Sequence, residues 1–147
     1  MTRRRIPLLV LVVAVLVAGM SSPVLADDVS RRDRMLHLLN KARRNHGLPV
    51  FRLNVDLSHF AWRHSKKMAE KRDCFHTQNL YDAVRSYNPS TWGENVGGAG
   101  SSRRIKKLWM GSSGHRANIL NARFRRIGIG TVKSNGRVWV TAIFYGG

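Results

Sequence analysis

The sequence predicts an α+β fold, because helical patterns occupy the first part of the chain and strand-like runs occupy its end. Up to about residue 121, apolar residues recur at helical spacing. After residue 126, two runs rich in β-branched and aromatic residues flank Asn135-Gly136, a strong signal for a β-hairpin. Helices followed by strands within the length of one domain indicate an α+β arrangement.

The first 26 residues have the features of an export signal. Arg3-Arg4-Arg5 form a basic start, Leu8 to Ala18 form an unbroken apolar run, and Val24-Leu25-Ala26 offer residues suited to a cleavage site. The apolar run is shorter than the roughly 20 residues of a comfortable bilayer span, and an uncleaved anchor is the alternative. We expect residues 1–26 to be a signal peptide and residues 27–147 to be a single domain, secreted or associated with the cell envelope.

Two amphipathic helices are predicted next. The first runs from Ser30 to His46 and stops at Gly47 and Pro49, with a short extended connector after it. Its apolar stripe consists of Met35, Leu36, Leu38, Leu39 and Ala42. The second is capped by Asn54 and runs to about Lys71. Its stripe consists of Leu57, Ala61, His64 and Met68, and His64 is therefore expected to be a packed histidine and not a ligand.

The middle of the chain is predicted to hold loops and two shorter helices. Residues 73–90 are expected to be irregular, and residues 97–100 (Gly-Gly-Ala-Gly) to form a tight turn, since no phosphate-loop motif accompanies them. Ser101 or Ser102 can cap a third helix, and Ser113 can cap a fourth that runs from Gly114 to about Asn121.

Charge and cysteine content limit the class of protein. The chain has 26 Lys and Arg against 8 Asp and Glu, for a net charge of +18, or +15 without Arg3, Arg4 and Arg5. Such a charge favours contact with anionic surfaces and weakens in salt. The single cysteine, Cys74, cannot pair within the chain. Burial as a small apolar residue is expected for it, and an intermolecular disulfide is the alternative.

A scarce acid and a scarce base are the best candidates for site chemistry. Glu94 lies between glycines in a chain poor in carboxylates, and His115 is the only histidine after residue 76. Both are placed where the backbone is expected to turn.

The chain resembles the CAP superfamily, which comprises cysteine-rich secretory proteins, antigen 5 and pathogenesis-related proteins and is also called the SCP domain. The resemblance covers essentially all of residues 27–147. The N-terminal motifs are Leu39-Asn40-x-x-Arg43, Gly47-Leu48-Pro49, Leu53-Asn54-x-x-Leu57, Met68-Ala69 and Phe75-His76. The later motifs are Gly93-Glu94-Asn95-Val96, Trp109-x-x-Ser112-x-x-His115-Arg116-x-Asn118-Ile119-Leu120, Phe124, Gly128-Ile129-Gly130 and the terminal strand around Trp139 to Phe144.

This resemblance implies an α-β-α sandwich, with helices packed on both faces of a small antiparallel sheet. It also implies a cleft with two histidines and two acidic residues, in which some members bind zinc through the histidines. His76, Glu94 and His115 match three of these positions. Ser112 stands where the fourth position has a glutamate, as in the short bacterial branch of the superfamily.

These residues suit more than one kind of site. Two neutral imidazoles, His76 and His115, can hold a divalent ion such as Zn²⁺ and leave coordination positions open. Glu94 can act as a base on bound water, or it can orient an imidazole by a hydrogen bond. The loss of a carboxylate at Ser112 should lower metal affinity. The alternative is a polar network that ties loops to the sheet without a metal.

Three functions follow as hypotheses. The first is an exported binding module for an anionic envelope component or a lipid-like ligand. The second is a metal-dependent hydrolase of peptide, glycan or lipid, with His76 and His115 as ligands and Glu94 as the catalytic base. The third is nucleic-acid binding, which rests on charge alone and is opposed by the export signal and by the lack of any nucleic-acid motif.

Overall fold

The computed structural model describes residues 23–147, so most of the predicted signal peptide lies outside the described residues. The helices are α1 (Pro23–Arg44), α2 (Val55–Lys71), α3 (Leu80–Val84), α4 (Ser102–Gly111) and α5 (Ser113–Leu120), with a 3₁₀ turn η1 at Arg85–Tyr87. The strands are β1 (Arg52–Leu53), β2 (Thr91–Ala99), β3 (Arg126–Ser134) and β4 (Arg137–Gly146).

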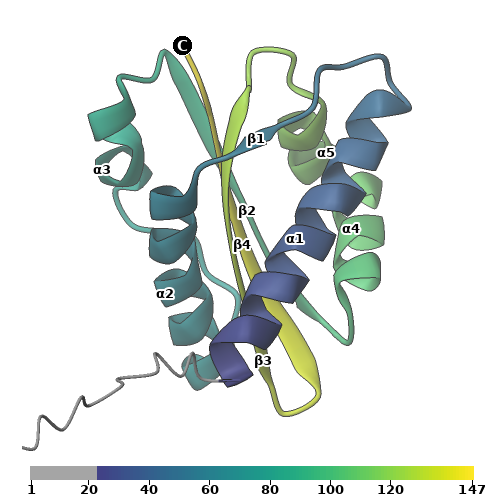
Figure 1. The fold of residues 1–147 in the computed structure, drawn as a ribbon, viewed down its shortest axis with the longest axis vertical. Helices are drawn as coiled ribbons and strands as arrows, with labels where there is room; N and C mark the ends of the chain where they lie inside the picture. Colours follow the sequence, from purple (N-terminus) through teal and green to yellow (C-terminus); the bar gives the residue numbers. More distant parts are fainter. Residues whose placement is uncertain (1–22) are drawn as a thin grey trace, which may run out of the picture.

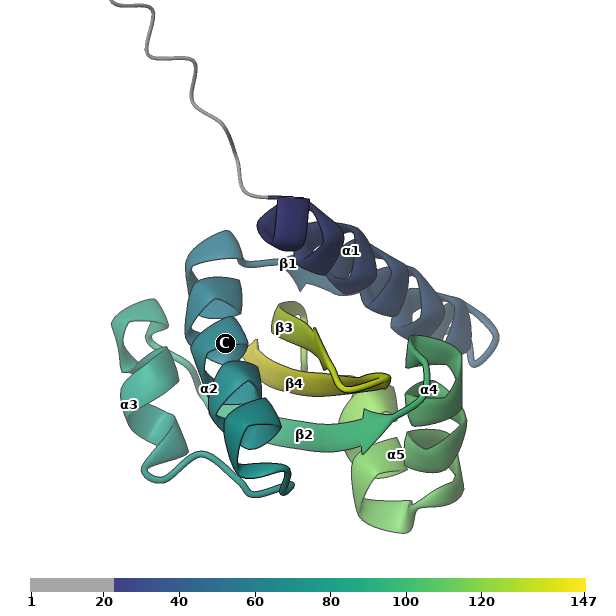
Figure 2. The same ribbon diagram turned by 90° about the horizontal axis from the view of Figure 1, so that it is seen from below.

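The predicted α-β-α sandwich is confirmed. Figures 1 and 2 show α2 and α3 on one face of the sheet and α1, α4 and α5 on the other. The sheet order is β1-β3-β4-β2. The pairs β2–β4 and β3–β4 are antiparallel, but the two-residue β1 pairs in parallel with β3. The sheet is therefore mixed and not purely antiparallel, because the connector after α1 crosses the end of β3 before entering α2.

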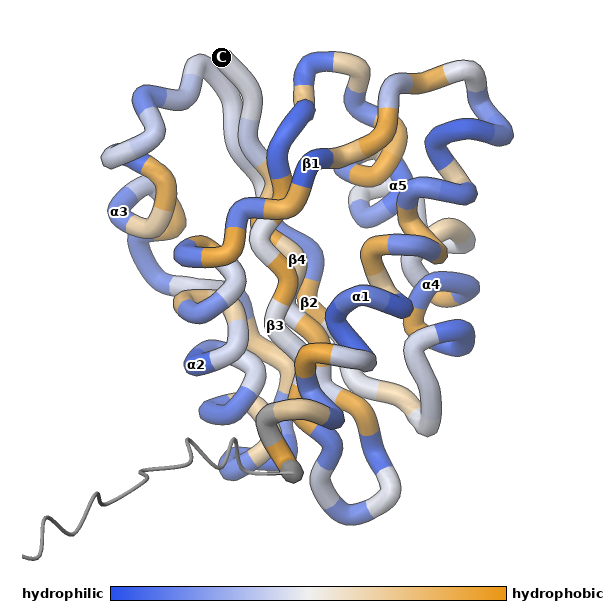
Figure 3. Tube along the Cα trace, viewed as in Figure 1, coloured by the Kyte–Doolittle hydropathy of each residue, from blue (hydrophilic) through white to orange (hydrophobic). Residues whose placement is uncertain are grey.

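Strand β4 lies at the centre of the core because both of its faces are covered. Alternate residues point to opposite faces of a strand. Val138, Val140, Ala142 and Phe144 pack in the cluster shared with α1, α4 and α5. Ile143 and Tyr145 pack instead with Leu57 and Ala61 of α2. Figure 3 shows hydrophobic segments along the central strands and hydrophilic ones recurring along the helices.

Several predicted boundaries are confirmed. The Asn54 side chain accepts a hydrogen bond from the Leu57 amide and caps α2, which ends at Lys71. Ser101 caps α4 by accepting from the Arg104 amide. Asn135 and Gly136 both have positive φ, at 49° and 72°, as a type I′ hairpin turn requires.

Helix α1 begins at Pro23 and not at Ser30. Proline is tolerated in the first turn of a helix, where its missing N–H has no carbonyl partner to lose. The buried Asp28 anchors this end of α1. Its carboxylate accepts from Arg31 Nη1 at 2.8 Å and from Trp62 Nε1 at 3.0 Å, and its carbonyl accepts from Thr131 Oγ1 at 2.9 Å. The predicted cleavage after Ala26 would leave these contacts in the chain.

Other predictions in the middle of the chain were wrong. Residues 97–99 belong to strand β2 and do not form a turn. Glycine is required there for packing, since a Cβ on Gly97 would lie 2.9 Å from Trp109 Nε1, and one on Gly98 would meet Arg137 and Trp139. Residues 73–90 contain α3 and η1. Cys74 is exposed and not buried, because it follows the left-handed turn at Arg72 that ends α2.

Candidate functional site

The four predicted cleft residues come from separate elements. His76 lies in the loop after α2, and Glu94 lies on β2. Ser112 joins α4 to α5, and His115 lies in the first turns of α5. The structure brings His76 into direct contact with Glu94, and it places Ser112 and His115 together around a separate small pocket.

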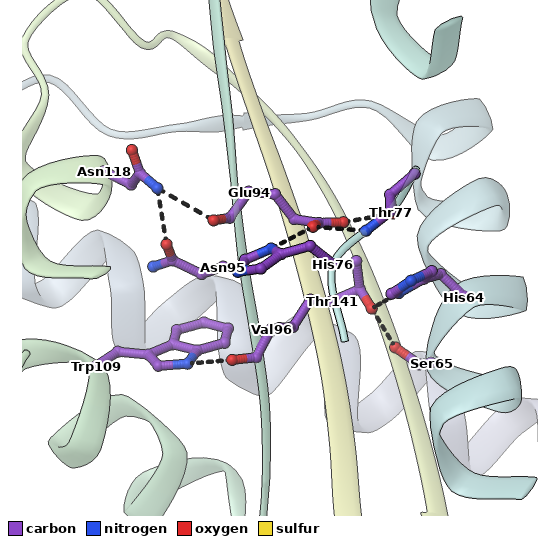
Figure 4. Close-up of polar contacts among 10 residues, drawn as sticks. All are labelled: His64, Ser65, His76, Thr77, Glu94, Asn95, Val96, Trp109, Asn118 and Thr141. Atoms are coloured by element: carbon purple, nitrogen blue, oxygen red, sulfur yellow. Dashed lines mark hydrogen bonds and ion pairs between the residues drawn. The ribbon is translucent and has the colours of Figure 1, made fainter. Parts of the chain in front are cut away.

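The Glu94 carboxylate is buried and accepts three hydrogen bonds from one loop. Glu94 is 6% exposed. Its Oε2 accepts from His76 Nδ1 at 2.7 Å and from the Thr77 amide at 3.0 Å, and its Oε1 accepts from Thr77 Oγ1 at 2.5 Å (Figure 4). Charge-assisted bonds of this kind are stronger than neutral ones. Glu94 therefore ties the loop after α2 to strand β2.

This contact also orients the His76 ring. Because Nδ1 donates to a carboxylate, it carries the proton, and in the neutral ring Nε2 holds the lone pair. The His76 side chain is 64% exposed, against 2% for Glu94. The accessible group of the pair is thus the imidazole. This geometry favours the orienting role for Glu94 over that of a base acting on water.

A second polar network ties helix α5 to β2 on the other side of the strand. Asn118 Nδ2 donates to the Glu94 carbonyl at 3.1 Å and to Asn95 Oδ1 at 2.9 Å. Asn95 Nδ2 donates in turn to the His115 carbonyl at 3.0 Å. Gly93 is required beside this network, since a Cβ there would lie 2.9 Å from Asn118 Oδ1. Asn95 and Asn118 fix the position of His115 relative to Glu94.

His115 is a half-buried imidazole next to an aromatic ring. Its ring stacks on Trp109 with centroids 6.0 Å apart, and the Trp109 indole donates to the Val96 carbonyl at 3.0 Å. Burial lowers the pKa of His115 below its usual value, and the neighbouring His76 lowers this pKa further. Both effects favour the neutral ring, which is the form that can accept a proton or bind a metal. His115, Ser112 and Trp109 line a pocket of about 280 Å³.

His76 opens onto a different and larger hollow. A cavity of about 770 Å³ lies between α2 and the loop that follows it. Its lining includes Phe60, Arg63, His64, Lys67, Phe75 and His76. His64 is buried, as its place on the apolar stripe predicts, and its Nδ1 lies 3.0 Å from Thr141 Oγ1 (Figure 4). Burial is the main cause that lowers the pKa of His64, while the negative charge of Glu94 acts in the opposite direction.

The residues present do not make a three-ligand metal site. Within residues 23–147, no group of three or more His, Cys, Asp or Glu side chains is placed to hold one ion. Glu94 is engaged by His76 and Thr77, and the residue at position 112 is a serine that cannot supply a carboxylate. Two imidazoles alone do not meet the usual minimum of three protein ligands for catalytic zinc. A site for Zn²⁺ at His76 and His115 remains a prediction.

Sequence reasoning missed three residues that build the site. Thr77 supplies two of the donors to Glu94, and Asn95 and Asn118 link α5 to β2. Asn95 and Asn118 occur in the quoted motifs, so the signal was present, but neither was assigned a role. Thr77 follows His76 directly, and nothing in the pattern indicated that its hydroxyl faces Glu94.

Comparisons with known proteins agree with this architecture. Residues 36–144 match the model of the cysteine-rich secretory protein family, CAP. The chain is 35% identical over 113 residues to the uncharacterized protein YkwD of Bacillus subtilis. The matched region covers 72% of this chain and 44% of that protein. An extracellular SCP-domain protein from Bacillus anthracis superposes with a TM-score of 0.70 at 25% identity, over 88% of this chain and 45% of that one. An outer surface protein of Borrelia burgdorferi superposes with a TM-score of 0.71 at 16% identity, over 80% and 92% of the two chains.

The chain thus spans less than half the length of the two Bacillus proteins. No helix among residues 23–147 is long and apolar enough to cross a membrane. The family match covers most of the chain and includes every residue of the cleft, from His76 to His115. The chain belongs to the cysteine-rich secretory protein family, CAP.

Proposed function

We propose that this protein is an exported binding module that holds an anionic component of the cell envelope. Export is supported by the sequence of residues 1–26 and by neighbours that are described as an extracellular protein and an outer surface protein. The anionic nature of the partner is supported by the charge of the chain. The cleft supplies an oriented, accessible imidazole at His76 and no free carboxylate base.

The observation that carries the proposal is that most Lys and Arg side chains among residues 23–147 lack an acidic partner. Within residues 23–147, the Lys and Arg side chains that lie in an ion pair are those of Arg31, Arg32, Lys66 and Arg85. Exposed basic side chains without acidic partners raise the local concentration of anions around the whole molecule. Binding that depends on this field should weaken as salt shortens the Debye length from about 10 Å at 0.1 M to about 3 Å at 1 M.

The test is retention of the exported, purified protein on isolated envelopes, on acidic phospholipid vesicles and on wall polymers, each across a salt gradient. We expect retention at low salt that is lost as salt rises. Heparin and DNA are the controls, because equal retention on both would mark the binding as unspecific electrostatics. Absence of salt-sensitive retention on all three envelope materials would reject the proposal.

A metal-dependent hydrolase is the competing function, and its distinguishing requirement is a bound ion. Zinc titration by calorimetry, with a His76→Ala/His115→Ala variant as control, tests whether the two imidazoles bind an ion. About one equivalent of zinc bound by the wild type and lost in the control would support the hydrolase. If the protein is a hydrolase, Glu94→Gln should abolish turnover of a peptide, glycan or lipid substrate while the fold is kept. Retained turnover in that variant would exclude Glu94 as the base.

A further inference from the structure

A polar hollow lies at the end of the molecule where α1 begins, apart from the cleft. Figure 1 shows the first turns of α1, the turn between β2 and α4, and the β3–β4 hairpin at this same end. The hollow has a volume of about 360 Å³. Its lining residues come from all three places and include Asp27, Arg31, Arg34, Ser102, Arg103 and Lys133.

The hollow has an excess of positive charge. Arg31 pairs with Asp27 and Asp28, each 2.8 Å away, so this group sets two negative charges against one positive charge. Arg34 of α1, Arg103 of α4 and Lys133 of β3 form no ion pair and no side-chain hydrogen bond with residues 23–147. Three like charges from three elements repel one another across one hollow, and this repulsion opposes folding. An anion bound in the hollow would attract all three charges, and this attraction would favour the folded state.

The start of α4 adds to the same field. The first amides of a helix have no carbonyl partner within the helix, and they carry the positive end of its dipole. Acidic side chains usually occupy this place, but the first turn of α4 has none and holds Arg103 and Arg104 instead. Ser101 satisfies only the Arg104 amide. The amides of Ser102 and Arg103 are free of side-chain caps.

The hydroxyl of Ser102 is a further donor without a protein partner at the hollow. Ser102 is 5% exposed and lines the hollow. Its Oγ forms no hydrogen bond with residues 23–147. Among these residues, His64 Nε2 is the only fully buried side-chain atom without a hydrogen-bond partner, so the unpaired Ser102 Oγ is not fully buried. Ser102 lines the hollow, and its hydroxyl, which has no protein partner, keeps contact with solvent. Buried polar side chains are nearly always hydrogen-bonded to protein or water, so this hydroxyl is open to water or to a ligand oxygen in the hollow.

We infer that this hollow binds a phosphate group. Phosphate offers several acceptor oxygens, which suit donors arriving from three sides: two guanidinium groups, one ammonium group, the Ser102 hydroxyl and the first amides of α4. The inference rests on the proposed function and deepens it, because it locates the anionic partner and names its chemistry. A phospholipid headgroup and a phosphodiester polymer of the envelope share this chemistry.

The site can be tested with inorganic phosphate as the probe. Amide signals of the ¹⁵N-labelled exported protein are followed during phosphate titration at constant ionic strength, with chloride as the balancing ion. We expect saturable shifts at the amides of Ser102 and Arg103. A variant with Arg34→Gln, Arg103→Gln and Lys133→Gln should lose at least tenfold in affinity, and Ser102→Ala should lose severalfold.

The matched control removes equal charge on β1, at the start of β3 and in the loop that precedes β3. The variant Arg52→Gln/Arg123→Gln/Arg126→Gln changes three exposed arginines that make no side-chain hydrogen bond or ion pair with residues 23–147. It should keep the wild-type affinity for phosphate. Equal weakening in both triple variants, or no saturable shift at α4, would overturn the site and leave only a general electrostatic field.

Two further ligands separate the sources of phosphate and keep the two proposals distinguishable. Vesicles containing phosphatidylglycerol and a soluble poly(glycerol phosphate) are compared with the wild type and with the variant that lacks the three charges of the hollow. The ligand whose binding falls in that variant is the source. If envelopes retain this variant as well as the wild type, the binding module stands and the site fails. If phosphate binds at α4 but no envelope material is retained, the site stands and the binding module fails.

Discussion

The buried guanidinium of Arg43 is predicted to be a main support of the half of the molecule that carries His115. Arg43 is 0% exposed, and its guanidinium lies 4.0 Å from the centroid of the Phe51 ring. Burial, with a contribution from Arg125, lowers its pKa to about 10, so the group stays charged at neutral pH. It donates hydrogen bonds at 2.6–3.0 Å to the carbonyls of Pro49, Ile119, Asn121 and Phe124.

Replacement of Arg43 by methionine keeps a long apolar stem but removes every one of these donors. Water can reach the two carbonyls that lie near the surface, those of Pro49 and Asn121. The bonds to Ile119 and Phe124 are buried. With about 1.5–3 kcal/mol for each bond to a charged donor, the two buried bonds give about 3–6 kcal/mol. Methionine avoids the cost of burying a charge, so we expect a loss near the lower end of that range, about 3 kcal/mol.

The assay is equilibrium unfolding in urea, with the slope checked for constancy between variants. Arg44→Met is the matched control on the same helix. Arg44 is exposed in the last turn of α1, where a cation contributes only about 0.3–1 kcal/mol through the helix dipole. A loss below about 1 kcal/mol for Arg43→Met, or equal losses for both variants, would refute the reasoning.

Three further predictions follow from the packing and the titrating groups. Gly130→Ala should strongly destabilise the folded protein and lower its soluble yield, because a Cβ there would overlap the backbone of α2. Gly100→Ala is the control, because the space around Gly100 is open, and it should change the free energy of unfolding by less than about 1 kcal/mol. The pKa of His115, followed by NMR, should lie below its ordinary value of 6.5, and His76→Ala should raise it. Because the folded state disfavours the charged ring, this group lowers stability as the pH falls below 6.5. A pKa at or above 6.5 would contradict the burial argument. Cys74 is exposed and should react with a thiol reagent such as DTNB in the folded protein, but more slowly than a free thiol, because burial raises the pKa of its thiol. Protection that ends only on unfolding would show that it is covered.

The sequence was sufficient to predict the elements whose signals are local. The cap at Asn54 and the Asn135-Gly136 turn depend on neighbouring residues, and both appear as predicted. Strand β2 was missed because glycine has a low strand propensity. What makes β2 a strand is its pairing with β4 at all nine positions, and the glycines serve contacts with side chains far away in the sequence.

The site was predicted only in part for the same reason. The choice of His76, Glu94 and His115 came from scarcity and from the family resemblance, and the structure places each of them next to β2 or on it. Hydrogen bonds from a loop to a strand leave no periodic trace in a sequence. The roles of Thr77 and Asn118 could therefore be found only once the chain was folded.

The hydrogen bonds at Glu94 change what its substitution can prove. Glutamine at this position can keep its oxygen toward His76 Nδ1 and the Thr77 amide and donate from its NH₂ group to the Thr77 hydroxyl, but all three bonds lose the charge that strengthens them. The loop after α2 would then be loosened whether or not the carboxylate has a chemical role. Thr77→Val separates the two effects, because it removes the bond to Oε1 and leaves the carboxylate and its contact with His76 intact. If a function of the cleft is lost in Glu94→Gln and lost to a similar extent in Thr77→Val, it depends on the order of the loop. If it is lost only in Glu94→Gln, it depends on the charge.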